Sequence, residues 1–231
     1  MKKVLFILSL LIVYSLQLKA VSAAPCYGTH FPDKGKWNIG AQVHVIENRA
    51  LKKDYGKVSS TQYFYLMSFG VFSWLSIDGK IGVGDITYKP SGGAEKTNFP
   101  TNFAGGYGFR IKPYKNEQQK IDFVLGFQHI SVHPGSKIVN GAANSVILDD
   151  WQGSVLISKD FGLLTPYAGA RLTRLDLIQK IEGQSRFRKK SDVDICPVIG
   201  ADFNFTKQDF LNVEGSFIKE TSFSLGFTHN F

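Results

Sequence analysis

The chain ends on the stretch TSFSLGFTHNF, which occupies residues 221–231. Its large apolar side chains fall on alternate positions, at Phe223, Leu225, Phe227 and Phe231. Successive side chains of a β-strand point to opposite faces of the sheet. This period of two therefore predicts a strand with one apolar face and one small or polar face.

The same alternation runs backward through most of the chain, for example in YFYLMSFGV at residues 63–71. After residue 23 we find no sustained helical period, which predicts an all-β protein. Ten strands are expected, at residues 36–47, 61–72, 75–88, 102–112, 119–131, 145–158, 163–176, 191–205, 210–218 and 222–231. Most of them suit the ~9–11 tilted residues that cross a bilayer better than the ~5–6 residues of an average soluble strand.

The connections between these strands alternate in length. Short ones are expected near residues 73–74, 113–118, 159–162 and 206–209, and long polar ones near 48–60, 89–101, 132–144 and 177–190. Short turns on one rim and long loops on the other are typical of outer-membrane barrels. The pattern predicts an antiparallel up-and-down transmembrane β-barrel of about ten strands, or of eight if segments 36–47 or 210–218 fail to pair.

Alternation alone does not decide which face meets the solvent. The polar face carries many glycines, such as Gly82 and Gly106, which suit a crowded lumen better than a soluble outer surface. Bulky aromatics such as Trp37 and Trp74 lie near strand ends, where interfacial girdles form. Both features favour an outward apolar face. A soluble periplasmic ligand-binding barrel is the alternative.

The last strand resembles the terminal strand of bacterial outer-membrane β-barrel proteins, a class that includes OmpA-like and porin-like barrels. In that class an alternating aromatic strand ending in Phe is read by the barrel-assembly machinery. The resemblance implies that Phe223, Leu225, Phe227 and Phe231 form an assembly signal. The stretch GVFSWL, residues 70–75, also resembles a periplasmic turn common in small barrels. The resemblance implies location in the cell outer membrane of a Gram-negative-type bacterium, but no activity.

The N-terminus has the features of a secretory signal peptide. Lys2 and Lys3 precede a mostly apolar run, and the small residues up to Ala23 offer a cleavage site. We expect residues 1–23 to be the signal peptide, 24–35 a periplasmic segment and 36–231 the barrel domain.

The chain contains two cysteines, too few for a disulfide scaffold. Cys26 and Cys196 are expected at opposite ends of the barrel. They could pair only if residues 24–35 thread up the lumen.

Charged residues on the inward face are expected to balance, which argues against a strongly selective pore. The predicted lumen set is Asp78, Lys80, Arg110, Lys120, Asp122, Asp150, Arg171, Asp194, Asp202 and Glu214. Among these, Asp78, Arg110 and Asp122 should meet at the short-turn end as an ion-pair cluster that partly plugs the lumen. Separate hydration of each charge is the alternative.

The catalytic candidates are His129, Ser131 and Asp149, which share a strand face toward lipid near the long-loop end. Serine as nucleophile, histidine as base and aspartate as orienter would form a triad for acyl esters. The His-x-Ser spacing resembles outer-membrane phospholipases and lipid A deacylases. Those enzymes usually carry Asn where this chain has Val132, and their third residue lies closer to the serine. A polar pair at the membrane interface is the alternative interpretation.

We therefore expect a monomeric barrel with a structural or surface role, or a narrow pore for small solutes, and no enzyme activity. The alternative is an outer-membrane lipid hydrolase.

The sequence contains no recognised metal or cofactor motif, and we expect no cofactor and no nucleic-acid partner. The expected partners are outer-membrane lipids and, during biogenesis, the assembly machinery. The basic run at residues 186–190 suits lipopolysaccharide phosphates, although a solvated loop explains it equally well.

Overall fold

The computed structural model describes residues 28–52, 54–93 and 95–231, and every strand lies within those ranges. The strands are β1 Trp37–Ala50, β2 Lys57–Phe72, β3 Leu75–Lys89, β4 Thr97–Asn116, β5 Ile121–Val132, β6 Lys137–Val139, β7 Ala142–Lys159, β8 Leu164–Ile181, β9 Phe187–Lys190, β10 Asp194–Asn204, β11 Asp209–Ser216 and β12 Glu220–Asn230. Among the described residues, no helix is long and apolar enough to cross a membrane.

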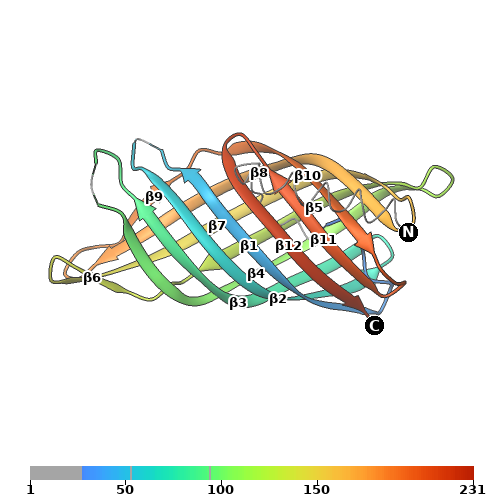
Figure 1. Ribbon diagram of the computed structural model, residues 1–231, viewed down its shortest axis with the longest axis horizontal. Helices are drawn as coiled ribbons and strands as arrows, with labels where there is room; N and C mark the ends of the chain where they lie inside the picture. The colour runs from blue at the N-terminus through green and yellow to red at the C-terminus, as the bar shows by residue number, and fades with distance from the viewer. Residues whose placement is uncertain (1–27, 53, 94) are drawn as a thin grey trace, which may run out of the picture.

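Ten of these strands close into an antiparallel barrel (Figure 1). Each pairs with its neighbours along the chain, β5 pairs with β7, β8 with β10, and β1 closes the circle against β12. The predicted fold class is confirmed. Segments 36–47 and 210–218 both pair, so the eight-stranded alternative is wrong. The short strands β6 and β9 lengthen the rim beside β7 and β8 and were not predicted. Strands of three and four residues offer too few alternations to be recognised.

The closing seam pairs the first strand with the last, with one register shift between Ile46 and Asn48. Val43 lies opposite Leu225, and the backbone N–H of Phe231 donates to the Trp37 carbonyl at 3.0 Å. Gly40 permits a close approach here, because a Cβ at this position would lie 2.1 Å from the Phe227 carbonyl oxygen. The C-terminal strand therefore contributes directly to closure of the wall.

The long-loop rim differs from the prediction. Strands occupy much of the segments predicted as long loops, and β4, β7 and β8 reach 20, 18 and 18 residues. On the opposite side, β10, β11 and β12 span only 11, 8 and 11 residues. The wall is therefore tall on one side, where β6 and β9 lie, and short on the other (Figure 1). These strand extensions were not predicted, because their outer faces carry polar residues and the alternation of apolar and polar positions is lost there.

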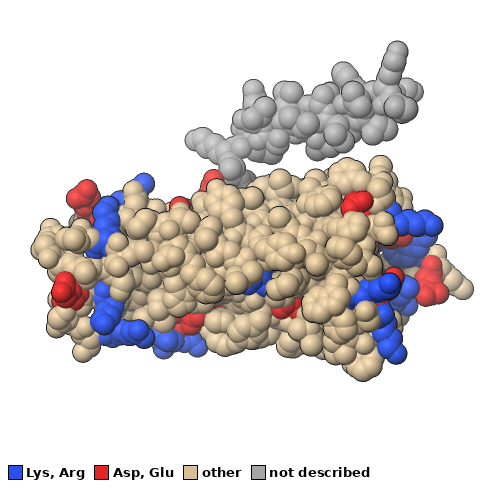
Figure 2. Space-filling view, turned by 90° about the horizontal axis from the view of Figure 1, so that it is seen from below, with Lys and Arg blue, Asp and Glu red and all other residues tan. Residues whose placement is uncertain are grey.

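The outer surface carries a broad apolar band, and charged side chains collect toward the two ends of the barrel (Figure 2). Exposed residues of the band include Trp37, Tyr65, Ile77, Ile81, Phe109, Leu125, Val155, Ile199, Leu225 and Phe227. This distribution confirms the outward orientation of the main apolar face.

A second apolar set, which the prediction missed, lies inside the long-loop half of the barrel. It includes Ile46, Leu51, Val58, Phe64, Ile86, Phe99, Val132, Leu148, Leu175 and Leu177. Beyond the outer apolar band, the outer face of the wall meets water. Apolar side chains in this half can therefore be buried only on the inner face. The inward face is therefore polar in one half and apolar in the other.

Candidate functional site

Residues 28–36, here called the plug segment, lie in the lumen mouth at the short-turn rim. At Gly35 (φ 76°) the chain turns, and the Gly35 N–H donates to the Gly70 carbonyl at 2.7 Å. Gly70 N–H in turn donates to the Lys36 carbonyl at 3.1 Å. A Cβ at Gly70 would lie 2.2 Å from the Asp33 carbonyl oxygen, so only glycine fits this crossing. The described part of the predicted periplasmic segment is thus docked in the barrel.

Arg110 joins the plug segment to the barrel wall. Its Nε and Nη2 donate to the two Asp78 carboxylate oxygens at 2.9 and 2.8 Å, and both side chains are buried. Its Nη1 donates to the carbonyls of His30 at 2.7 Å and Gly28 at 3.3 Å. One guanidinium therefore satisfies a wall carboxylate and two backbone oxygens of the plug segment together.

The third member of the predicted cluster lies in a separate pair. Asp122 accepts from Lys112 Nζ at 2.6 Å, not from Arg110. Phe31 of the plug segment lies between the two cations, with its ring centre 4.7 Å from Lys112 Nζ and 4.9 Å from the Arg110 guanidinium carbon. The structure thus brings Asp78 and Arg110 together and places Asp122 in an adjacent pair across the aromatic ring.

Two further contacts hold the plug segment from the opposite wall. Asp202 accepts from the backbone N–H and hydroxyl of Thr29 at 3.3 and 3.1 Å. Asn230 donates to His30 Nε2 at 2.9 Å, and the His30 ring packs on Phe210 with centroids 4.3 Å apart. Burial, together with the positive charges of Arg110 and Lys112, lowers the pKa of His30 from 6.5 to about 4. At neutral pH the imidazole is uncharged and can accept this hydrogen bond.

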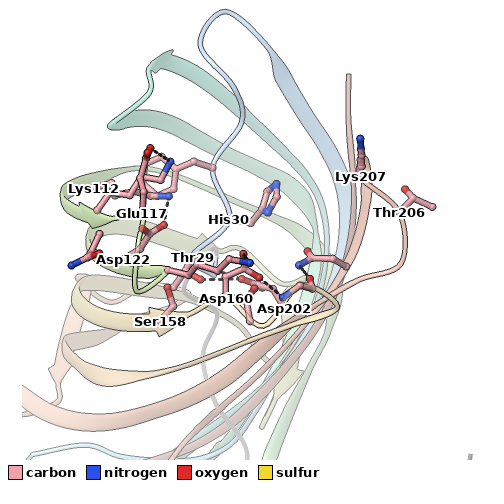
Figure 3. A pocket seen from close by; sticks show the side chains of 17 residues that line it. Thr29, His30, Lys112, Glu117, Asp122, Ser158, Asp160, Asp202, Thr206 and Lys207 are labelled. Atoms are coloured by element: carbon pink, nitrogen blue, oxygen red, sulfur yellow. Dashed lines mark hydrogen bonds and ion pairs between the residues drawn. The ribbon is translucent and has the colours of Figure 1, made fainter. Parts of the chain in front are cut away.

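Beside the plug segment a cavity of about 590 Å³ opens at the short-turn rim (Figure 3). Its lining mixes both charge signs, including Lys112, Lys120 and Lys207 with Asp122 and Asp160. Further in, the space between Gly28, Arg110, Gln128 and Arg171 is only about 10 Å³. That space is roughly enough for one water molecule.

A cluster of buried charges adjoins this space, which Arg171 also lines. Glu220 accepts from Arg49 Nη1 at 3.1 Å and from Arg171 Nη2 at 2.9 Å, and all three side chains are fully buried. Arg49 also contacts Asp194 at 3.3 Å. The inner apolar set lies toward the long-loop rim beyond this cluster.

Arg49 and Glu220 were missed as lumen residues because both fell in segments predicted as loops. A register shift in β1 between Ile46 and Asn48 moves Arg49 off the simple parity. Glu220 does continue the inward parity of β12, so extending that strand would have found it. Lys120 was wrongly placed in the lumen. It lies in the turn before β5, 3.8 Å from Asp160, with 58% of its side chain exposed.

Cys196 is a buried free thiol, 3.9 Å from Arg49 Nη1. Cys26 lies outside the described residues, so the question whether the two cysteines pair stays open.

The outer-face candidates form two pairs instead of one triad. His129 Nε2 lies 2.5 Å from Asp149 Oδ1, and the His129 ring packs on Trp151 at 4.1 Å between centroids. Ser131 is the register partner of Asp149, but its hydroxyl bonds to His133 Nε2 at 2.9 Å. His133 was not predicted, although its spacing of two from Ser131 places it on the same strand face.

The basic run forms β9 and does not remain a solvated loop. Lys189 points inward, where its Nζ donates to Tyr88 Oη at 2.9 Å and Gln179 Oε1 at 2.6 Å. Arg188 instead contacts Asp176 at 3.0 Å on the outer face of β8.

Neither a scan against protein-family models nor a search of curated protein sequences finds a match for this chain. Solved barrels are similar in structure. The translocator domain of the autotransporter NalP from Neisseria meningitidis is 13% identical, with a TM-score of 0.42 over 85% of this chain and 88% of that one. The outer membrane protease OmpT from Escherichia coli is 10% identical, with a TM-score of 0.47 over 89% of this chain and all 100% of that one.

The transport unit of the autotransporter AIDA-I, also from Escherichia coli, is 12% identical, with a TM-score of 0.41 over 90% of this chain and 93% of that one. Such distant likenesses transfer no residue role. The fold class itself rests on the closed antiparallel wall and its outward apolar band.

Proposed function

We propose that this chain is an integral outer-membrane barrel with a closed lumen and a structural or surface role. The observation that carries the proposal is the set of buried side chains that pack inside the barrel, among which a cavity of only about 10 Å³ lies beside Gly28, Arg110 and Arg171. A hydrated ion needs a continuous water-filled path, and the buried Arg49–Glu220–Arg171 cluster and the inner apolar set leave little room for one. A barrel of about eight strands is just wide enough for side chains to fill it, and the diameter grows only in proportion to strand number.

The outer apolar band supports the membrane location. Side chains such as Ile77, Ile81 and Val155 expose about half of their surface. Exposed apolar surface of this extent is rare on water-soluble monomers and is typical of a surface that contacts a membrane or another protein. Charged residues gather at the two ends, where lipid headgroups would meet them (Figure 2). In this placement the short turns, the C-terminus and the plug segment face the periplasm. The predicted signal peptide, residues 1–23, lies outside the described residues.

Two measurements test this proposal together. Density-gradient fractionation should recover the protein with outer membranes, in a form whose gel mobility changes on heating. Proteoliposomes carrying it should exclude small sugars in a swelling assay, whereas liposomes with an open porin swell. Recovery in the soluble periplasmic fraction would refute the membrane location, and rapid swelling would refute the closed lumen.

A second candidate function, hydrolysis of lipid acyl esters, is favoured by the outer-face pairs. The Ser131 hydroxyl could attack an ester carbonyl while His133 accepts its proton, and the lipid alcohol would leave with that proton. Water would then hydrolyse the acyl-enzyme through the same histidine. The side chains of His129 and Asp149 are 15% and 18% exposed, so this polar pair lies at the surface that lipids would reach.

The test compares Ser131→Ala with Ser145→Ala in the refolded protein, using phospholipid and lipid A as substrates. Ser145 lies on the outer face of β7, where its hydroxyl donates to the Lys180 carbonyl at 3.4 Å, so it is a matched control. Hydrolase function predicts acyl release that is lost in Ser131→Ala and His133→Ala but kept in Ser145→Ala. Absence of acyl release from the wild type would exclude it for these substrates.

A further inference from the structure

The outer face of β8 and β9 carries two arginines around one buried carboxylate. Arg174 Nη2 lies 3.3 Å from Asp176 Oδ2, and Arg188 Nη1 lies 3.0 Å from the same oxygen. The Asp176 side chain is only 2% exposed, whereas those of Arg174 and Arg188 are 44% and 48% exposed. We call these three residues the arginine pair site.

The positive charges of the arginine pair site outnumber the negative charge that Asp176 supplies. Asp176 supplies one negative charge to two guanidiniums, and Lys190 is the register partner of Asp176 on β9. Asp149 is the register partner on the other side, but its oxygens already contact His129 and the Trp151 indole N–H. A guanidinium carries five N–H donors. Because both arginines contact the same oxygen, most of their donors stay available to a ligand.

The height of the site on the wall points to the ligand. Arg174 is the register partner of Trp151, and tryptophan in outer-membrane barrels marks the membrane–water interface. Leu172, two residues nearer the short-turn end, exposes 52% of its surface within the apolar band. Arg188 is the register partner of Ile178, four residues beyond Arg174 on β8. The guanidiniums therefore lie at the level of the headgroups in the leaflet on the long-loop side.

We propose that the arginine pair site binds a phosphate group of the outer-leaflet glycolipid, lipopolysaccharide. Planar guanidiniums match phosphate oxygens in bidentate geometry, and two of them held side by side can bind one phosphate from both flanks. Asp176 acts as the positioning residue, since its carboxylate holds the two cations together when no phosphate is bound. The proposal rests on the membrane location and on the orientation proposed above.

The direct test is native mass spectrometry of the refolded full-length mature protein in detergent. The probes are bis-phosphorylated lipid A, dephosphorylated lipid A and phosphatidylglycerol. We expect a one-to-one adduct with the bis-phosphorylated form and an adduct weaker by about tenfold or more with the dephosphorylated form. Equal binding of both forms of lipid A would overturn phosphate recognition. Equal, arginine-dependent binding of phosphatidylglycerol would overturn the assignment to the glycolipid.

The variants separate recognition from folding. Arg174→Gln/Asp176→Asn/Arg188→Gln removes the whole charge set, leaves no buried charge unpaired and should lose the adduct. Arg174→Lys/Arg188→Lys keeps the positive charge but lacks the planar guanidinium groups. This variant should therefore show a weaker lipid A adduct than the wild type. The control, Lys115→Gln/Lys120→Gln, removes two cations from the opposite rim and should bind as the wild type does.

Wild-type affinity in the triple variant would overturn the proposal, as would loss of binding in the control. Heat-modifiable gel mobility must be retained in each variant that is compared. If a variant fails to fold, lipid A protection of Arg174 and Arg188 from a guanidinium-modifying reagent in the wild type provides the same test, and lack of protection overturns the proposal. Conductance of the wild type is independent of these results, so failure of the lipid site would not be confused with failure of the closed-lumen proposal.

Discussion

At the residue scale, closure of the mouth depends on Arg110. Its guanidinium bridges Asp78 of the wall and two carbonyls of the plug segment, all in a buried setting. Removing one partner of a buried ion pair leaves the other charge without compensation, which is far more costly than removing both.

Arg110→Gln should therefore lower the free energy of unfolding by about 3–5 kcal/mol. Asp78→Asn should do the same, and Asp78→Asn/Arg110→Gln should lose much less than the sum of the two. Urea unfolding in micelles, followed by heat-modifiable gel mobility, measures this. Additive losses in the double variant would contradict the pairing.

His30 should make docking of the plug segment depend on pH. Its pKa is about 4 when docked and 6.5 when free, so the undocked segment binds more protons between those values. Docking is then strongest above pH 6.5, weakens as the pH falls toward 4 and changes no further below that. Hydrogen exchange of residues 28–36, corrected for intrinsic rates, should show less protection at pH 5 than at pH 7.5. His30→Gln is the control, and an equal loss of protection in that variant would exclude His30 as the cause.

At the element scale, β12 serves both closure and the proposed assembly signal. Its outward residues Phe223, Leu225 and Phe227 belong to the apolar band, and Phe231 exposes 60% of its surface beyond the strand end. Because Phe231 adds little buried area, its contribution to the stability of the finished barrel should be small.

Phe231→Ala should therefore reduce the amount of protein assembled in the outer membrane of cells while leaving refolding into lipid vesicles nearly unchanged. Quantitative immunoblots of membrane fractions and vesicle refolding yields measure the two effects. Ile218→Ala, which alters an exposed apolar residue in the turn before β12, is the matched control. Equal effects of Phe231→Ala in cells and in vesicles would contradict an assembly role.

The strands were predictable where one face meets lipid and the other meets the lumen. Alternation in residues 63–71 or 221–231 records that asymmetry directly. The alternation is lost where the outer face of the wall meets water. The predicted strands therefore begin too late for β4 and β7, at 102 and 145, and the one for β8 stops too early, at 176. The turn between β11 and β12 is short although it lies on the long-loop rim. The rim is therefore lower at these two short strands than at β7 and β8.

The candidate sites were predictable only in part. Asp78 and Arg110 were correctly placed near each other because adjacent strands and parity suffice for that inference. The alternative partners, Lys112 for Asp122 and His133 for Ser131, depend on side-chain reach that periodicity does not describe. The Arg49–Glu220 pair required knowledge of a register shift in β1.

At the scale of the whole molecule, we propose that successive groups of side chains close the lumen. The plug segment fills the mouth, the buried charges of Arg49, Arg171 and Glu220 lie above it, and the inner apolar set lies beyond them. Because the last two groups belong to the wall itself, removal of residues 24–36 should enlarge the mouth cavity without opening a through-path. Conductance of that truncated barrel should remain as low as that of the full mature chain.

The closed lumen can be tested by single-channel recording of the refolded mature protein in a planar lipid bilayer. Insertion is confirmed independently by heat-modifiable mobility of the same preparation. A closed lumen predicts a silent bilayer at neutral pH under moderate voltage. Discrete, reproducible conductance steps from the folded protein would contradict it and would identify the barrel as a pore.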